Sequence, residues 1–269
     1  MLLSKARAFI ERDFVVESSY KAAFAFESLR SLFPLFSFYY VSQLVARSPL
    51  SSRFADDGGY FPFVVVGVAL STYFMHAVHS FGGIVRRTQA VGCLEAVLST
   101  RTSPQTVILL SPLYSFCSKT LHIVLIFVVG GLVLDVDFRR CNYVSAVATL
   151  GLAVAAFSGL GILSAALIVV LKKSDPIEWV MGSTLSLLSG AYFPVSLLPQ
   201  WVRPLAACSP MTHALNAMRL AVLQGYSVSR LGRELTSLGA TAVVLIPIGV
   251  YCFGKAVEKG RRDGTLLDH

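Results

Sequence analysis

Long apolar stretches separated by short charged segments dominate the chain. The longest runs from Tyr143 to Leu171, 29 residues without a charged side chain and without Asn, Gln or His. A helix of about 20 apolar residues crosses the roughly 30 Å hydrocarbon core of a bilayer, whereas the helices and strands of soluble domains are shorter and are interrupted by polar positions. The pattern therefore predicts an integral membrane protein.

Six such stretches predict six membrane-spanning helices. They cover residues 29–45, 61–81, 107–134, 143–171, 179–198 and 235–253. Pro194 breaks the fifth span, and Ser111-Pro112 is expected to break the third, which is too long for one crossing. The fold class that follows is an all-α integral membrane protein, with residues 1–269 as a single transmembrane domain.

Composition supports this fold class and removes several alternatives. Hydrophobic residues make up 55% of the chain and charged residues 14%, against about 25% charged residues in soluble domains. The five cysteines never form a Cys-x-x-Cys pair, so they predict neither a disulfide framework nor a zinc site. Charges within the first 13 positions occupy the place where a signal peptide is apolar, so we expect no cleaved leader.

The distribution of Lys and Arg predicts the orientation, because cytoplasmic loops carry an excess of both. With the amino terminus inside, the cytoplasmic segments hold 14 of these residues and the outside segments hold 8. We therefore expect a multi-pass protein of the cell membrane with both termini in the cytoplasm. The basic residues stand singly or in pairs without an aromatic stacking platform, so the formal net charge of +8 does not indicate nucleic-acid binding.

The residues before the first span predict an interfacial helix over residues 1–28, lying in the cytoplasmic surface of the membrane. Apolar residues and charges alternate there, and Glu17 and Lys21 stand at the i, i+4 spacing of a helix. The apolar and charged faces of this predicted helix are not cleanly separated, because Asp13 and Glu17 fall on the same side as Phe9.

Small residues recur in the fourth span, where Gly151, Ala155 and Gly159 are four positions apart. Such a stripe lets helix backbones approach closely in lipid. It predicts either a dimer face or packing within one subunit.

The cytoplasmic loop between the second and third spans, residues 85–104, predicts a short helix. Val91, Leu94 and Leu98 share one side of it, and Pro104 ends it. A cytoplasmic helix with an apolar and a charged face suits docking to another protein; a plain connecting loop is the alternative.

Prolines interrupt residues 193–210, where four of them occur. No single helix continues through them, yet the segment is too apolar for a free outside loop, with Leu197, Leu198 and Trp201 among its residues. This combination predicts a re-entrant turn that dips into the outer leaflet and is shielded by neighbouring helices. A further helix is expected over residues 211–223, and it carries Arg219.

The cytoplasmic loop of residues 85–104 and the proline-interrupted segment after span five together resemble the membrane subunit of ABC-2-type exporters. In that family a Gly-Thr-Leu-Glu motif and a Ser/Pro-containing segment form the coupling helix, and this chain has Gly92-Cys93-Leu94-Glu95 and then Ser103-Pro104. The family's progression after span five is matched by Ser189-Gly190, Phe193-Pro194, Leu198-Pro199-Gln200-Trp201, Pro210 and Arg219. Cys93 in place of Thr, and Ser209 in place of the commoner Asn, depart from the pattern.

The resemblance implies an ABC-2 (type V exporter-like) architecture and a division of labour. Such subunits pair, as a homodimer or with a similar permease, and bind two cytoplasmic ABC ATPase subunits through the coupling and amino-terminal helices. ATP and Mg would be bound by that partner, so this chain is expected to be a transport subunit, not an enzyme, with no cofactor of its own. The absence of a Gly-x4-Gly-Lys-Ser/Thr phosphate loop in the sequence agrees.

The resemblance also implies which residues carry these roles. The ATPase-coupling residues would be Arg87, Val91, Gly92, Leu94, Glu95 and Leu98. The re-entrant segment would use Gly190, Phe193, Pro194, Leu198, Pro199, Trp201, Pro210 and Arg219.

Ionisable residues within the spans are the remaining candidates. Lys119 and His122 stand at i, i+3 in the third span, and His76 and His79 do so in the second. A Lys at the bilayer centre costs about 2.5–3.5 kcal/mol on insertion scales, so it faces the bundle interior or reaches an interface. Lys119 and His122 are therefore candidates for the export path, where Lys119 would meet an anionic head group or phosphate; a position nearer an interface, with Lys119 paired or hydrated, is the alternative. Two histidines without a third ligand make no metal site.

The predicted function is export of an amphipathic or lipid-like molecule: a drug, a natural product or a lipid. No extracytoplasmic domain large enough to read a glycan is apparent, although an exporter of lipid-linked polysaccharide stays an alternative. An ATP-independent secondary transporter is an alternative of another class, but such folds show two related halves, and no internal repeat is visible. An intramembrane serine protease would need Gly-x-Ser-Gly, and Ala156 replaces the first Gly of that motif.

Overall fold

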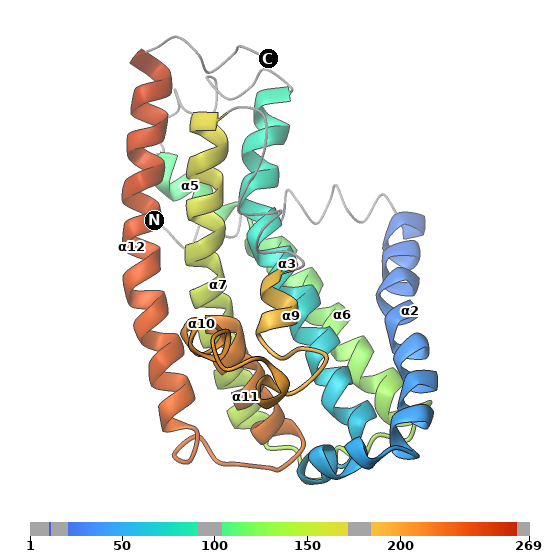
Figure 1. The fold of residues 1–269 in the computed structure, drawn as a ribbon. Helices are drawn as coiled ribbons and strands as arrows, with labels where there is room; N and C mark the ends of the chain where they lie inside the picture. The colour runs from blue at the N-terminus through green and yellow to red at the C-terminus, as the bar shows by residue number, and fades with distance from the viewer. Residues whose placement is uncertain (1–10, 12–20, 91–103, 172–183, 263–269) are drawn as a thin grey trace.

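The computed structural model describes residues 11, 21–90, 104–171 and 184–262, and every regular element in these ranges is helical (Figure 1). The long helices are α2 (Lys21–Ala46), α3 (Tyr60–Ala90), α6 (Leu113–Leu132), α7 (Tyr143–Leu171) and α12 (Gly232–Arg262). The short ones are η1 (Pro49–Asp57), α5 (Pro104–Leu110), α9 (Ser186–Leu188), η3 (Val195–Leu197), α10 (Arg203–Cys208) and α11 (Pro210–Val222). The all-α fold class is confirmed for this part of the chain.

Four of the described helical stretches are long and apolar enough to cross a bilayer. They are Tyr60–Arg86, Ile108–Leu132, Tyr143–Leu171 and Gly232–Lys259, and they correspond to the predicted second, third, fourth and sixth spans. A shorter apolar helix, Leu32–Ala46, takes the place of the first. Residues 179–183 of the fifth predicted span lie outside the described ranges, so the count of six spans stays a prediction.

The break that we expected within the third span is confirmed. Helix α5 ends at Leu110 and α6 begins at Leu113, with Ser111 and Pro112 between them. Proline lacks the backbone N–H that a continuous helix would need at this position.

Two predicted boundaries differ from the structure. Helix α3 runs on to Ala90, so residues 85–90 continue the second span instead of beginning the coupling helix. Residues 21–28, which we assigned to the interfacial helix, form the first turns of α2. In both places good helix formers such as Arg, Gln, Lys and Ala adjoin the apolar stretch and no proline separates them from it, so the helix extends past the change in polarity.

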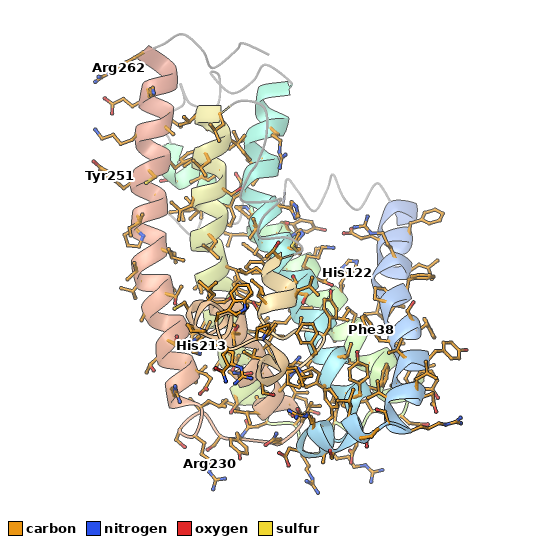
Figure 2. All side chains as sticks on the ribbon, viewed as in Figure 1. Phe38, His122, His213, Arg230, Tyr251 and Arg262 are labelled. Atoms are coloured by element: carbon orange, nitrogen blue, oxygen red, sulfur yellow. The ribbon has the colours of Figure 1, made fainter. Side chains whose placement is uncertain are left out.

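The long helices alternate in direction for most of the chain. In Figure 1, α2 and α6 run from the upper to the lower end, and α3, α7 and α12 run from the lower to the upper end. Arg230, in the loop between α11 and α12, marks the lower end, and Arg262 marks the upper end (Figure 2). Helices α10 and α11 occupy only the lower half, where α11 packs on α7 and α10 packs on α11.

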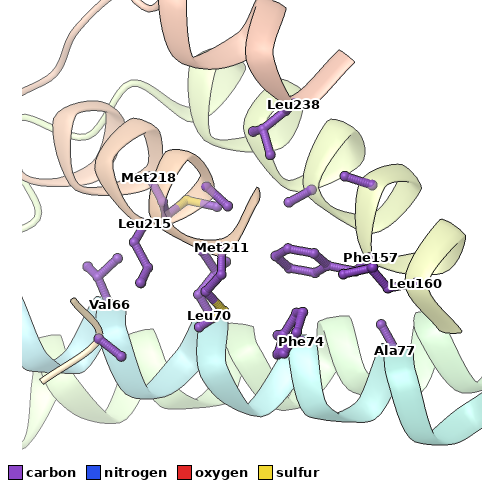
Figure 3. Close-up of a cluster of buried hydrophobic side chains, with 14 of the residues drawn as sticks. Val66, Leu70, Phe74, Ala77, Phe157, Leu160, Met211, Leu215, Met218 and Leu238 are labelled. Atoms are coloured by element: carbon purple, nitrogen blue, oxygen red, sulfur yellow. The ribbon is translucent and has the colours of Figure 1, made fainter. Parts of the chain in front are cut away.

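Helix α7 is the centre of the bundle and packs against α3, α11 and α12. Its apolar residues extend around the whole helix, which is typical of a helix enclosed on most sides. The ring of Phe157 meets that of Phe74 on α3 edge to face, with centroids 4.8 Å apart. Figure 3 shows the surrounding core, with labelled members Val66, Leu70, Phe74, Ala77, Phe157, Leu160, Met211, Leu215, Met218 and Leu238.

The stripe of small residues on α7 divides between two environments. At Gly159 an added Cβ would stand 2.6 Å from Cβ of Leu245 on α12, so this glycine permits close helix packing inside the subunit. Gly151 is exposed, and a Cβ there would meet nothing within 4 Å. Packing within one subunit is therefore the role of Gly159.

Candidate functional site

The segment from α9 to α11 folds back on itself in the lower half of the bundle. The buried hydroxyls of Ser189 and Ser209, at its two ends, are 3.0 Å apart and share a hydrogen bond. Between them Gly190 takes a left-handed conformation with φ of 83°, which glycine adopts without steric cost. A Cβ at Gly190 would also come within 2.9 Å of Val195 Cγ2.

The predicted residues of the re-entrant segment lie at different depths. Gly190, Leu198 and Arg219 are buried, Phe193, Pro194 and Pro210 are half-buried, and Pro199 and Trp201 are exposed. Pro210 is the first residue of α11, where a missing N–H costs nothing. Trp201 is 77% exposed, a position that suits an amphipathic ring at the membrane interface.

Arg219 joins this segment to the rest of the bundle. It is buried on α11, and its Nη2 donates to the carbonyl oxygens of Gly190 at 2.9 Å and Ala191 at 3.0 Å. Its Nε donates to the carbonyl of Phe63 on α3 at 3.3 Å. The guanidinium carbon also lies 3.4 Å from the centroid of the Phe63 ring, in cation–π geometry.

The backbone of α3 approaches the same segment at Gly67. An added Cβ on Gly67 would clash with the carbonyl oxygen of Ala191 and would lie 3.2 Å from Nη2 of Arg219. Only glycine leaves room for this contact. One charged side chain and one glycine thus hold α3, α11 and the segment after α9 together.

A cavity of about 720 Å³ lies between α2, α3, α6 and α9. Its wall is made of polar and ionisable side chains interspersed with apolar ones. They are Glu27, Arg30, Ser71, Thr72, Met75, His76, His79, Lys119, Ser186, Leu187 and Tyr192. The ring of Tyr192 stacks on Phe38 with centroids 5.3 Å apart, which holds α2 against the segment after α9 beside the cavity.

Lys119 carries a charge into this cavity from α6. The residue is 9% exposed, and its ammonium group forms an ion pair with the half-exposed carboxylate of Glu27 on α2. A buried ammonium group needs such a partner because its desolvation is costly. The expectation that Lys119 faces the bundle interior agrees with this placement.

The histidines occupy different surroundings. His76 and His79 line the cavity; the ring of His76 is hydrogen-bonded to the hydroxyl of Ser115, and Nδ1 of His79 lies 2.7 Å from the carbonyl oxygen of Met75. His122 is buried, with its Nδ1 2.9 Å from the carbonyl oxygen of Ser118, and is not part of the cavity wall. Of the two residues that we predicted for the export path, the cavity contains Lys119 only.

Comparison with known protein families identifies the family of this chain. Residues 8–223 match the ABC-2 type transporter family. The chain belongs to this family. No match was found among curated proteins.

An ABC-2 type permease is a multi-pass membrane protein that works with a cytoplasmic ABC ATPase, and this chain is such a permease subunit. The match includes the predicted re-entrant segment, Arg219 and all the residues that line the cavity. Helix α12 lies after the matched region, although it packs extensively on α7.

The predicted coupling residues fall mostly beyond what the structure describes. Arg87 lies in the last turns of α3. Val91, Gly92, Leu94, Glu95 and Leu98 lie outside the described residues. The role of the coupling segment therefore stays a prediction from sequence.

Sequence reasoning missed the two charged residues that α2 contributes to the cavity wall. We had placed Glu27 at the end of the interfacial helix and Arg30 in the topological count only, yet both line the cavity from the first turns of α2. The spacing of Glu27 and Arg30 places both on one side of a helix, but it does not link them to Lys119, because a lysine in a span can also be satisfied by backbone carbonyls or by water.

Proposed function

We propose that this permease subunit exports an amphipathic or lipid-like molecule, such as a drug, a natural product or a lipid, from the cytoplasm or the inner leaflet. The observation that supports this cargo is the cavity between α2, α3, α6 and α9. Its wall combines an ion pair and hydroxyl groups with the apolar side chains of Met75 and Leu187. A molecule with one polar end and one apolar end matches such a lining.

The proposal includes the partners that power transport. Two cytoplasmic ABC ATPase subunits bind ATP and Mg and dock on the coupling segment that contains Glu95 and on the amino-terminal helix. The permease forms a homodimer or pairs with a similar permease in the cell membrane, with both termini in the cytoplasm. Closure of the ATPases is transmitted through the coupling segment and opens a path for the cargo.

The first experiment is to tag the chain in its native membrane, solubilise it gently and identify what stays bound. We expect a stoichiometric ATPase subunit with vanadate-sensitive hydrolysis, and an amphipathic cargo that stimulates it. Retention and movement of a lipid-linked glycan alone would replace the proposed cargo with a polysaccharide. A chain that purifies alone and moves solute in liposomes without ATP would contradict the proposal and favour a secondary transporter.

A further inference from the structure

We infer that the cavity binds the anionic group of an amphiphile, a phosphate or a carboxylate, through Lys119 and Arg30. In this inference the carboxylate of Glu27 pairs with the ammonium group of Lys119 when the cavity is empty, and the anionic group of the ligand displaces this carboxylate. The inference rests on the proposed function, because it names the chemical class of the cargo, but the binding that it describes needs neither ATP nor an ATPase.

The charges on the cavity wall favour an anion. Lys119 and Arg30 each contribute a positive charge, and Glu27 contributes one negative charge. Arg30 follows Glu27 by three positions on α2, so both side chains project from the same side of the helix. Among the described residues Glu27 pairs with Lys119 and not with Arg30, which leaves the guanidinium of Arg30 available to a ligand.

One neutral donor, the hydroxyl of Ser71, complements the two cations. Ser71 lines the cavity and is buried, with 5% of its surface exposed. The Tyr192 hydroxyl lies near its Oγ. However, among the described residues no hydrogen bond of ordinary geometry to this Oγ is formed. A buried polar atom without a partner is costly. An oxygen of an anionic group placed in the cavity would accept hydrogen bonds from this hydroxyl and from Lys119.

Glu27 is suited to leave Lys119 when a ligand arrives. Its carboxylate side chain is 45% exposed, whereas the side chain of Lys119 is 11% exposed. The carboxylate therefore regains water at little cost when it is displaced, while the buried ammonium group needs an anion throughout. Helix α2 also stands away from α3 towards its amino-terminal end, where Glu27 lies (Figure 1), so the side chain can move without disturbing the core.

The test is a binding experiment on the full chain in phosphatidylcholine nanodiscs, with empty nanodiscs as the blank. The probes are octyl phosphate, octyltrimethylammonium with the same chain length and opposite charge, and inorganic phosphate. The variants are Lys119→Gln, Arg30→Gln and Glu27→Gln, with Arg47→Gln as the control because Arg47 is exposed and follows the opposite end of α2. Isothermal titration calorimetry gives the Kd of each probe for each protein variant.

We expect octyl phosphate to bind in preference to the other two probes. Lys119→Gln should raise the Kd for octyl phosphate by about tenfold, the usual effect of losing a hydrogen bond to a charged group. Arg30→Gln should also weaken binding, and Arg47→Gln should not change it. Glu27→Gln should tighten binding, because it removes the competitor for Lys119; a gain of affinity cannot arise from misfolding.

Three outcomes would overturn the inference. Equal loss of binding in Lys119→Gln and Glu27→Gln would mean that the ion pair only supports the fold. Equal binding of octyl phosphate and octyltrimethylammonium would mean that the cavity does not select an anion. Equal binding of inorganic phosphate and octyl phosphate would mean that no amphiphile is required. Each of these results leaves the ATPase experiment on the proposed function unaffected.

Discussion

Arg219 is a buried cation whose hydrogen bonds go to backbone carbonyls. Burial of an arginine is costly unless its donors are satisfied, and here Gly190, Ala191 and Phe63 supply the acceptors. Carbonyl groups that follow the end of a helix lack intrahelical partners, and Gly190 and Ala191 come shortly after α9. The planar guanidinium serves two such carbonyls and one aromatic ring at once, which a lysine ammonium group cannot do.

We predict that Arg219→Lys lowers the stability of the permease by about 2–4 kcal/mol, because it leaves buried carbonyls without donors. Arg203 is a matched control: it donates to the carbonyls of Leu198 at 3.0 Å and Ser196 at 2.8 Å but is exposed. Arg203→Lys should change stability by about 0.5 kcal/mol or less. Melting temperatures in detergent would compare the two, and equal shifts would show that burial does not decide the role of Arg219.

The candidate residues show how far single positions were predictable. The cost of a lysine in lipid predicted that Lys119 either faces the bundle interior or reaches an interface, and the structure places it inside the bundle. Its partner Glu27 was not predicted, because 92 positions separate them and nothing local in the sequence links the two helices. The same holds for Arg219: its position in the motif was evident, but the contact with Phe63, 156 positions away, required the fold.

At the scale of the element, apolar length predicted helices more accurately than it predicted their ends. Helix α7 begins at Tyr143 as predicted, because turn-forming and charged residues come directly before it, and it is helical through Leu171, where the described range ends. Helices α3 and α12 both extend beyond the predicted apolar spans. Apolarity marks the part of a helix that lipid surrounds, whereas helix propensity and capping decide where the helix stops.

The α7–α12 contact gives a prediction at this scale. We expect Gly159→Val to destabilise the permease by about 1–3 kcal/mol, because the new side chain would overlap Leu245 in a packed interface. Gly151→Val, on the same stripe but with open space around it, should leave the stability of the subunit unchanged. Thermal unfolding of both variants tests this. If Gly151→Val were the more destabilising change, the assignment of Gly159 to packing within the subunit would be wrong.

The coupling segment gives a second prediction for an element. If Glu95 and its neighbours transmit the ATPase stroke, Glu95→Ala should reduce transport and cargo-stimulated ATP hydrolysis together, while the complex still assembles. Glu258→Ala is the control, because Glu258 is an exposed carboxylate on the last turns of α12, paired with Arg262 at 2.7 Å. Unchanged transport and stimulation in Glu95→Ala would remove Glu95 from the coupling role.

At the scale of the whole molecule, the arrangement of the ends bears on orientation. Helix α3 ends and α5 begins in the upper part of the bundle, where α12 also ends (Figure 1). The predicted coupling segment, between α3 and α5 in the chain, is thus attached to the end that carries Arg262. A cytoplasmic ATPase can reach the segment only if this end faces the cytoplasm, which is also what the excess of Lys and Arg predicts. The loop with Arg230 would then face outside.

Paired thiol labelling tests this orientation in intact cells. The five natural cysteines are first replaced by Ser, because Cys141, in the loop before α7, would be a poor reporter: burial raises the pKa of its thiol, and the thiolate is the reactive form. Arg230→Cys and Arg262→Cys are then made separately, since both arginines are exposed and lie at opposite ends (Figure 2). A membrane-impermeant maleimide should label Arg230→Cys in intact cells and Arg262→Cys only after permeabilisation. The reverse pattern would place the coupling segment outside, where no ATP is available, and would contradict both the orientation and the ATP-driven mechanism.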